Sequence, residues 1–387
     1  MSKLNVDTIE PEGASTTLTL GASGDTVDLS NTTVTLPDST YLANKNVAIN
    51  GAMQISQRGT SESSVTTAQY ADAPDRWYIQ LNGAGTWTVS QSTTAPNGFS
   101  HSYKFDCTTA DASLAASDRL YLAQKIEGQN LQRFAKGTAD AKKYTVSFWA
   151  RSSKTGTYIV GLWDADNSRQ CSQSYSIGSA DTWTKIEVEF PADTTGGITY
   201  DNSQGMQLIF YLAAGTDYSS GSLSTTWEAS DATKRAVGQV NVADSTSGDW
   251  YITGIQFEVG DTATPFEYKT FEQELAACQR YYERAETKGA GQGFDVWVNT
   301  TTQALGRWVF QVEKRTAPTF SVINAAADYA IFTAGTTNAV TALSAVGATT
   351  HNILLNASTG GGLTAGQAGD MRDDGNSLSG VQADAEL

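Results

Sequence analysis

The chain has 387 residues, which is enough for two or three domains and too many for one ordinary core. Its 41 acidic and 25 basic residues give a formal net charge of -16. That balance excludes a broad phosphate-binding surface, because nucleic-acid affinity depends largely on Lys and Arg. Ser, Thr and Gly are abundant, and nine Trp and sixteen Tyr are present, which is typical of β-sheet proteins with polar loops.

The cysteines and the apolar runs exclude two further classes of protein. Cys107, Cys171 and Cys278 are odd in number and far apart, and no C-x-x-C pair occurs, so neither a disulfide framework nor a zinc site is indicated. We expect free buried thiols. The longest apolar candidate, Met206 to Ala214, is strand-sized and far short of the roughly eighteen residues of a membrane span. We therefore predict no membrane insertion.

Residues 1–41 form a polar N-terminal segment with three thin apolar ridges. The ridges are pairs of apolar residues spaced by two, too sparse to be buried within one chain. The segment is either a flexible linker or a strand-like part buried between identical copies, with a homotrimer as the preferred assembly. The pairs are Leu18 and Leu20, Val27 and Leu29, and Val34 and Leu36.

Two phrases in this segment carry a family resemblance. Val6-Asp7-Thr8-Ile9 is followed by the stretch from Leu18 to Val27. This order resembles the N-terminal leader of tail-fibre-like structural proteins of marine bacteriophages. The resemblance implies a virion component attached through residues 1–41, whereas composition alone is also compatible with a disordered tail.

Residues 42–270 predict an antiparallel β-sandwich. Apolar and polar residues alternate in 144–152, 184–190 and 206–212, and Gly-, Asn-, Asp- and Ser-rich turns separate these runs. Within 144–152, Tyr144, Val146, Phe148 and Ala150 should share one face.

Several phrases in the same region resemble a jelly-roll domain of phage and prophage tail proteins, a fold similar to carbohydrate-binding modules. That resemblance implies a jelly-roll that closes with the strand and Ala-Thr-Pro-Phe-Glu ending of Asp249 to Tyr268. The opening phrases are Ile49-Asn50-Gly51, Gln57-Arg58-Gly59 and Asp75-Arg76-Trp77.

One helix is expected from Phe271 to about Arg284, inside a connecting segment 271–288. Phe271, Leu275, Cys278 and Tyr282 form an apolar stripe that should pack on a neighbouring β-domain, and Thr270 with Gln273 has capping-box spacing. The phrase ELAACQRYYER is typical of the phage proteins.

Residues 289–387 predict a smaller C-terminal β-domain. GFDVWVNT and ALGRWVFQVEKR should form paired strands, and the chain ends in Asp-Ala-Glu-Leu, an ending that recurs in the resembled family. The predicted fold class is therefore all-β: an extended N-terminal segment, a jelly-roll β-sandwich, one α-helix and a C-terminal β-domain.

No motif predicts catalysis. His101 and His351 lie in different predicted domains without a nearby nucleophile or metal-ligand spacing. Glu187 and Glu189 share a strand face about 7 Å apart, but Lys185 beside them favours an ordinary solvated surface. We predict no catalytic residues and no enzyme activity.

Aromatic residues are the better candidates for a ligand site, because sugar rings stack on Trp and Tyr. Trp149 and Arg151 share a strand face, Tyr211 lies on a predicted neighbouring strand, and Trp163 lies at a strand end near acidic residues. These four residues are the predicted glycan contacts. The alternative is that the rings fill the sandwich or pack beneath loops.

The resemblance also implies an optional structural calcium ion, placed near Asn50 and Glu258. A hard cation needs several oxygen ligands, and only one good acid is identified, so no metal ligand set and no other cofactor is predicted.

The resemblance as a whole implies a bacteriophage structural protein, a tail fibre or tail-associated appendage involved in adhesion to the host surface. It would reside in the virion after assembly in the host cytoplasm, with other virion proteins and a host surface glycan as partners. The alternatives are a capsid fibre or decoration protein, a glycan-depolymerising tailspike, and a structural spacer without a ligand.

Overall fold

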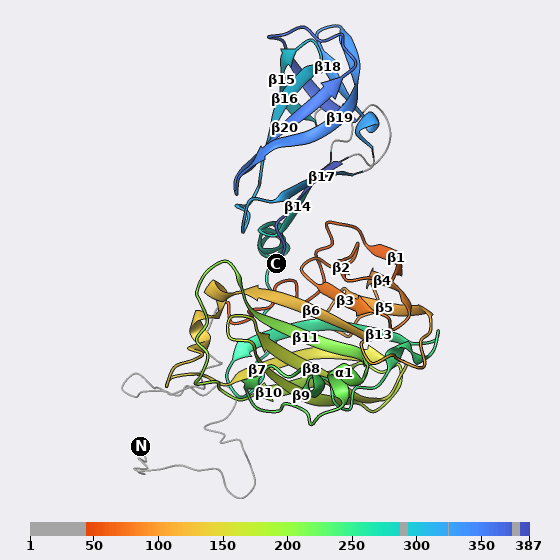
Figure 1. Cartoon of the computed structure of the whole chain (residues 1–387), viewed down its shortest axis with the longest axis vertical. Coiled ribbons are helices and arrows are strands. Elements are labelled where there is room, and N and C mark those ends of the chain that lie inside the picture. Colours follow the sequence, from red (N-terminus) through yellow and green to blue (C-terminus); the bar gives the residue numbers. More distant parts are fainter. Residues whose placement is uncertain (1–43, 287–292, 324, 374–379) are drawn as a thin grey trace, which may run out of the picture.

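The computed structural model describes residues 44–286, 293–323, 325–373 and 380–387. Within these ranges the chain is almost entirely β-structure, which confirms the predicted fold class. A wide β-sandwich lies at one end of the long axis and a narrower β-barrel at the other (Figure 1). The predicted oligomerisation segment, residues 1–41, lies outside the described residues.

The jelly-roll sandwich consists of two antiparallel sheets packed face to face. The six-stranded sheet has the order β1 (Ser61–Val65), β4 (Thr86–Ser92), β5 (Ser102–Thr109), β13 (Asp249–Val259), β7 (Tyr144–Ser152) and β10 (Thr184–Phe190). The seven-stranded sheet has the order β12 (Glu228–Ala229), β9 (Arg169–Ile177), β8 (Gly156–Asp164), β11 (Gln204–Ala214), β6 (Arg119–Glu127), β3 (Tyr78–Asn82) and β2 (Gln69–Tyr70).

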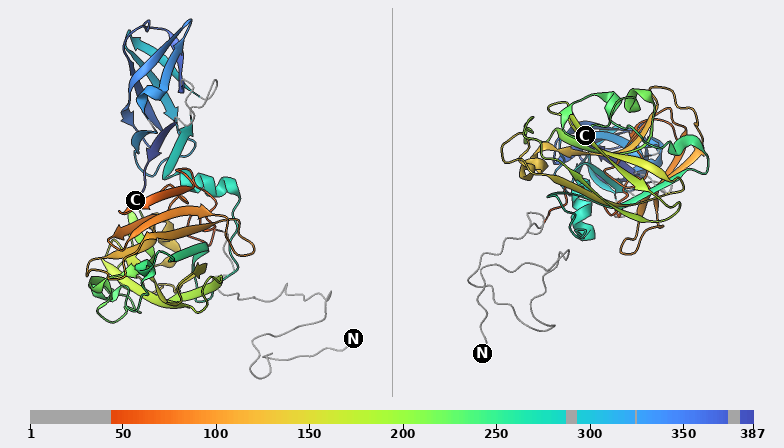
Figure 2. Two further views of the ribbon diagram at one scale, coloured as in Figure 1. Left: turned by 90° about the vertical axis from the view of Figure 1, so that its right-hand side faces the viewer. Right: turned by 90° about the horizontal axis from the view of Figure 1, so that it is seen from below.

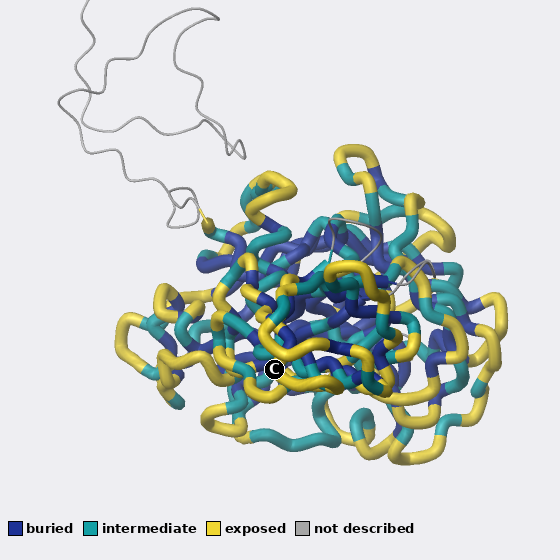
Figure 3. The backbone as a smooth tube through the Cα atoms, turned by 90° about the horizontal axis from the view of Figure 1, so that it is seen from above, coloured by how far each residue is buried: buried dark blue, intermediate teal, exposed yellow. Residues whose placement is uncertain are grey.

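The core between the sheets follows from the period of two in the strands. In β10, Ile186, Val188 and Phe190 are buried while the residues between them are exposed, as the alternation predicts. Buried backbone is concentrated in the middle of the molecule and exposed loops surround it (Figure 3). Trp87 and Trp250 are fully buried there, so aromatic area contributes much of the hydrophobic stabilisation.

Residues 215–240 fold over the outer face of the seven-stranded sheet. Ala236 in this segment packs in one buried cluster with Ile159, Ile209 and Tyr211 of the sheet. This face is therefore buried as well. The short helical turns in and next to this segment are α1 (Thr216–Ser219), η3 (Ala232–Lys234) and η4 (Val242–Asp244), and a further turn, η2 (Gly128–Phe134), follows β6.

The helix α2 spans Phe271–Gln279 and is shorter than predicted. Its capping box at Thr270 and Gln273 is confirmed, but the chain leaves the helix after Arg280 and enters strand β14 (Tyr282–Glu286). The predicted stripe is also wrong at its start: Phe271 is 54% exposed, whereas Cys278 is fully buried. Strand pairing of β14 with β22 outweighs continuation of the helix.

The C-terminal region contains two β-structures, which lie above the sandwich in the left view of Figure 2. A three-stranded sheet of β14, β22 (Gly380–Asp384) and β17 (Thr319–Ile323) lies next to the sandwich. Beyond it a closed barrel has the order β15 (Phe294–Thr300), β16 (Gln303–Val309), β20 (Asn352–Thr359), β19 (Thr336–Ala348), β18 (Tyr329–Thr333) and β21 (Ala368–Asp373), with the turn η5 (Ala326–Asp328) before β18. The predicted pairing of β15 with β16 is confirmed.

The cysteine prediction is also confirmed, because Cys107, Cys171 and Cys278 are free and buried. None of the helices in the described ranges combines the length and the apolar character that crossing a membrane requires.

Candidate functional site

An aromatic pocket of about 280 Å³ lies on the outer face of the six-stranded sheet. Strands β7, β10 and β13 form its floor, where Trp149 and Lys185 are opposite each other in the strand register. Two loops form its walls: residues 97–99 and residues 264–268. Binding sites commonly form where a rigid sheet holds loops and their side chains in place.

Three rings in the walls form one aromatic group. Phe99 and Phe266 lie 5.1 Å apart between ring centres, Phe266 and Tyr268 lie 4.9 Å apart, and Phe99 and Tyr268 lie 5.7 Å apart. Tyr268 is 61% exposed, so one ring of the group faces solvent. With the half-buried Trp149 on the floor, the pocket offers several ring faces to an apolar surface of a ligand.

Gly254 in β13 makes room for this arrangement. Its φ is +64°, and a Cβ at this position would lie 2.6 Å from the ring of Phe99. Glycine is therefore required both by the backbone conformation and by the close approach of the ring.

Glu258, also in β13, holds the second wall. Its carboxylate accepts hydrogen bonds from the Thr264 backbone N–H at 2.9 Å and from the Thr264 hydroxyl at 2.7 Å. Three residues after Thr264, Glu267 donates its backbone N–H to the side-chain oxygen of Gln256 at 2.8 Å. These bonds fix the loop that carries Phe266 and Tyr268.

Polar groups complete the pocket. The Lys185 ammonium lies 2.6 Å from Glu187 at the rim. The Ser147 hydroxyl and the Asn97 amide line the pocket, and within the described ranges neither makes a hydrogen bond to another protein group. Both remain able to bond ligand hydroxyl groups, so the pocket combines stacking surfaces with a few polar groups that can orient a ligand.

Of the four predicted ligand contacts, Trp149 lies in this pocket. Arg151 lies two residues further along β7, and its guanidinium is held by Asp181 through two hydrogen bonds of 3.0 Å. It also lies 4.9 Å from the centre of the Tyr251 ring. Arg151 therefore belongs to a neighbouring surface cluster and does not line the pocket.

Trp163 and Tyr211 lie on the other sheet, so the structure does not bring them together with Trp149. Tyr211 is 2% exposed, and it packs with the partly buried Trp163 beneath residues 215–240. Tyr211 thus offers almost no surface to a ligand, because the strand pattern gives the face of a side chain but not the segment that folds over that face.

The sequence reasoning missed Phe99, Phe266 and Tyr268. Phe266 stands in the Ala-Thr-Pro-Phe-Glu phrase that was used only as a family marker. Both loops lie outside the alternating strands, so no periodicity indicated where their rings point.

The calcium position near Asn50 and Glu258 is not supported by the geometry. The Asn50 side chain bonds the backbone of Ile55 and Asp75, and the Glu258 carboxylate is occupied by Thr264 and Gln256. Their oxygens thus belong to two separate networks. In the described part of the chain no group of three metal-binding side chains occurs.

The residues weighed for catalysis lie apart. His101 is in the sandwich beside Ser100, and His351 is in the barrel 3.8 Å from Glu313. Glu187 and Glu189 are exposed, and they pair with two different lysines, Lys185 at 2.6 Å and Lys143 at 2.8 Å.

No protein-family model matches the chain, and no curated protein matches it. Solved structures with partial likeness include the tailspike protein 4 enzymatically active domain of bacteriophage CBA120, at 13% identity and a TM-score of 0.29 over 56% of this chain and 21% of that one. Others are a CBM4 protein (13%, TM-score 0.28, 54% of this chain and 97% of that one) and TmCBM61 in complex with β-1,4-galactotriose (13%, TM-score 0.27, 56% and 99%). The chain spans about a fifth of the length of the tailspike domain.

Proposed function

We propose that this protein is a glycan-binding adhesion component of a bacteriophage virion, a tail fibre or other tail-associated appendage. The observation that carries the binding role is the aromatic pocket, in which Trp149, Phe99, Phe266 and Tyr268 surround a space of about 280 Å³ with free polar groups beside them. The C–H faces of a sugar would stack on the rings, and Ser147 and Asn97 would bond its hydroxyls.

The virion assignment rests on the sequence. The leader phrases in residues 1–41 and the phrases of the jelly-roll resemble phage tail proteins, and we propose that residues 1–41 join the protein to other virion proteins and to two further copies of itself. Several weak glycan contacts on one oligomer would strengthen adhesion through effective concentration. A virion reconstruction with this chain traced to the tail would support the assignment, and a position on the capsid would contradict it.

The binding role is tested by titrating the full chain with host surface glycan fragments. Trp149→Ala should weaken binding by up to about tenfold, since a lost stacking contact is worth roughly 0.5–1.5 kcal/mol. Trp183→Ala is the matched control, because Trp183 packs on Tyr251 on the same sheet face and does not line the pocket. Equal binding by the wild type and Trp149→Ala would contradict the role of the pocket.

We further propose that the protein binds glycan without cleaving it. Hydrolysis by two carboxylates needs an acid and a base or nucleophile facing one substrate, whereas Glu187 and Glu189 are each paired with a lysine on an exposed strand. Incubation with host glycan should release no reducing ends. Sustained release that disappears in Glu187→Gln or Glu189→Gln would instead identify a depolymerising tailspike.

A further inference from the structure

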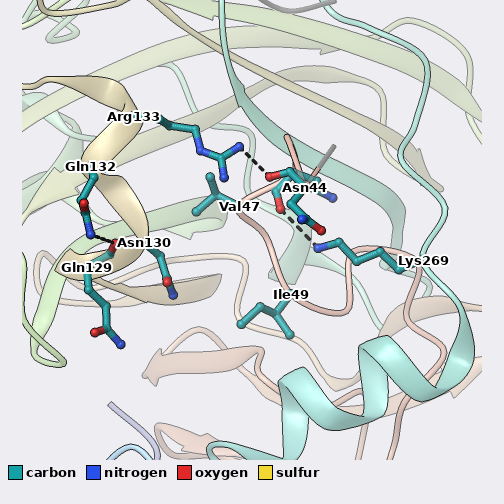
Figure 4. A pocket seen from close by; sticks show the side chains of 9 residues that line it. Asn44, Val47, Ile49, Gln129, Asn130, Gln132, Arg133 and Lys269 are labelled. Atoms are coloured by element: carbon teal, nitrogen blue, oxygen red, sulfur yellow. Dashed lines mark hydrogen bonds between the residues drawn. The ribbon is translucent and has the colours of Figure 1, made fainter. Parts of the chain in front are cut away.

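A second pocket, of about 420 Å³, lies behind one wall of the aromatic pocket. The segment 264–269 separates the two: Tyr268 lines the aromatic pocket and the next residue, Lys269, lines the second one. Residues of η2 form the opposite side, and Arg133 and Lys269 both point toward the segment 44–46, where they bond the carbonyls of Asn44 and Asn46 (Figure 4). We call this the polar pocket.

Two cations, Arg133 and Lys269, line the polar pocket of a protein of formal net charge -16. Arg133 donates one hydrogen bond to the Asn44 carbonyl at 2.5 Å, and Lys269 donates one to the Asn46 carbonyl at 3.3 Å. A guanidinium has five N–H donors and an ammonium three, so most of the donors of both groups remain available.

Two carboxylates near Lys269, Glu267 and Glu274, do not cancel this capacity, because each accepts backbone N–H groups, Glu274 that of Asn50 at 2.7 Å. Glu267 uses one oxygen to accept the backbone N–H of Asn44 and the other to accept that of Asn46 at 2.8 Å. Glu267 therefore holds the backbone that forms the wall of the pocket. Within the described residues it forms no ion pair with Arg133 or Lys269.

Amide side chains fill the rest of the lining. Gln129, Asn130 and Gln132 come from η2, and Val47 and Ile49 add an apolar strip (Figure 4). Amides both donate to and accept from hydroxyl groups, and the volume falls within the roughly 300–1,000 Å³ of small-molecule sites. A ligand that carries a carboxylate for the cations and hydroxyls for the amides has the chemistry that suits this lining.

We propose that the polar pocket binds the carboxylate of an acidic sugar, so that the protein recognises a glycan containing hexuronate residues. The inference rests on the proposed glycan-binding function and adds the class of glycan. Arg133 binds the carboxylate through its paired N–H groups, Lys269 adds a second charge, and the amides of η2 bind the ring hydroxyls.

The test compares acidic trisaccharides with their own carboxyl-reduced forms by calorimetric titration of the full chain. Trimers of galacturonate, glucuronate and mannuronate serve as probes. At least one acidic trimer should bind about tenfold or more tightly than its reduced form, because hydrogen bonds between ionised groups are about twice as strong as neutral ones. This preference should shrink as salt is raised.

Variants then test whether the preference for the acidic trimer arises at Arg133 and Lys269. Arg133→Gln and Lys269→Gln should each reduce the affinity for the acidic trimer about fivefold to tenfold, and the affinity for the reduced form should fall by a clearly smaller factor. Lys143→Gln is the matched control, because Lys143 is exposed, pairs with Glu189 and lines neither pocket.

The outcomes separate this inference from the proposed function. Equal binding of acidic and reduced trimers, or an acid preference that survives Arg133→Gln, overturns the polar pocket while glycan binding at Trp149 stands. Absence of binding by every trimer overturns the inference as well. Acid preference that is lost in Arg133→Gln and kept in Trp149→Ala supports the polar pocket even if the aromatic pocket fails its own test.

Discussion

Arg76 and Glu386 form an ion pair that is buried on both sides, although the two residues are 310 positions apart. Arg58 lies 3.5 Å from the same carboxylate. Two rings cover the guanidinium groups: Tyr281 lies 3.4 Å from Arg76 and Tyr282 lies 3.7 Å from Arg58, measured to the ring centres. The last residues of the described chain thus close back onto the sandwich.

Four of the phrases that carry the family resemblance meet at this junction. Arg58 belongs to Gln57-Arg58-Gly59, Arg76 to Asp75-Arg76-Trp77 and Glu386 to the final Asp-Ala-Glu-Leu. The tyrosines belong to ELAACQRYYER. These four phrases therefore build the connection between the sandwich and the C-terminal β-structures, whereas two other phrases, Ile49-Asn50-Gly51 and Ala-Thr-Pro-Phe-Glu, supply Ile49 and Phe266 to the two pockets.

We predict that Glu386→Gln destabilises the protein by roughly 3–5 kcal/mol, because removing one partner leaves buried charge without compensation. Chemical unfolding of the wild type and the variant measures the difference. Glu189→Gln is the control, since Glu189 pairs with Lys143 on the exposed surface and should cost less than about 1 kcal/mol. A Glu386→Gln variant as stable as this control would show that the junction does not depend on the ion pair.

A second buried network, centred on Asp193 in the loop after β10, predicts sensitivity to acid. Burial alone would raise the pKa of Asp193, but hydrogen bonds from Arg169, Lys136 and Thr195 outweigh burial and hold that pKa below its ordinary 3.8. The folded chain then releases this proton at lower pH than the unfolded chain does. The stabilisation is therefore present above about pH 4 and is lost as the pH falls through the folded-state pKa.

Asp193→Asn should lower the free energy of unfolding at neutral pH by about 1–3 kcal/mol and flatten its decline below about pH 4. Unfolding curves recorded from pH 7 to pH 3 measure both effects. Asp181→Asn removes an exposed partner of Arg151 and should leave the acid decline in place. An unchanged acid profile in Asp193→Asn would argue against the assigned linkage.

The faces of the strands were predictable from sequence, whereas the two loops that complete the aromatic pocket were not, and the reason is physical. Alternation in β10 assigns each side chain to the core or to solvent because the strand period is two, and the same rule placed Trp149 on the outer face. The position of Phe99 beside Phe266 depends on how two loops, far apart in sequence, fold over one sheet. The end of α2 was missed because its C-terminal stretch pairs as a strand with β22.

The oligomeric state remains a prediction from the N-terminal sequence. Burial of the apolar pairs between copies should make the full chain a trimer by light scattering, and replacing both Val27 and Leu29 with Asp should lower the mass. Thr19→Asp is the control, since Thr19 stands between Leu18 and Leu20 and would point away from the ridge. A monomeric full chain at micromolar concentration would contradict the prediction.

Gly254→Ala should damage the aromatic pocket without touching any polar group. The new Cβ would lie 2.6 Å from the Phe99 ring, so this ring must move away from Phe266 and Tyr268, and affinity for glycan fragments should fall severalfold. Gly238→Ala is a matched control, because Gly238 also has a positive φ, +87°, but its nearest neighbour is the Thr157 methyl group at 4.0 Å. Both variants should lose about 1 kcal/mol of stability from backbone strain, and only Gly254→Ala should lose affinity. Equal affinities in the two variants would place the glycan away from Phe99.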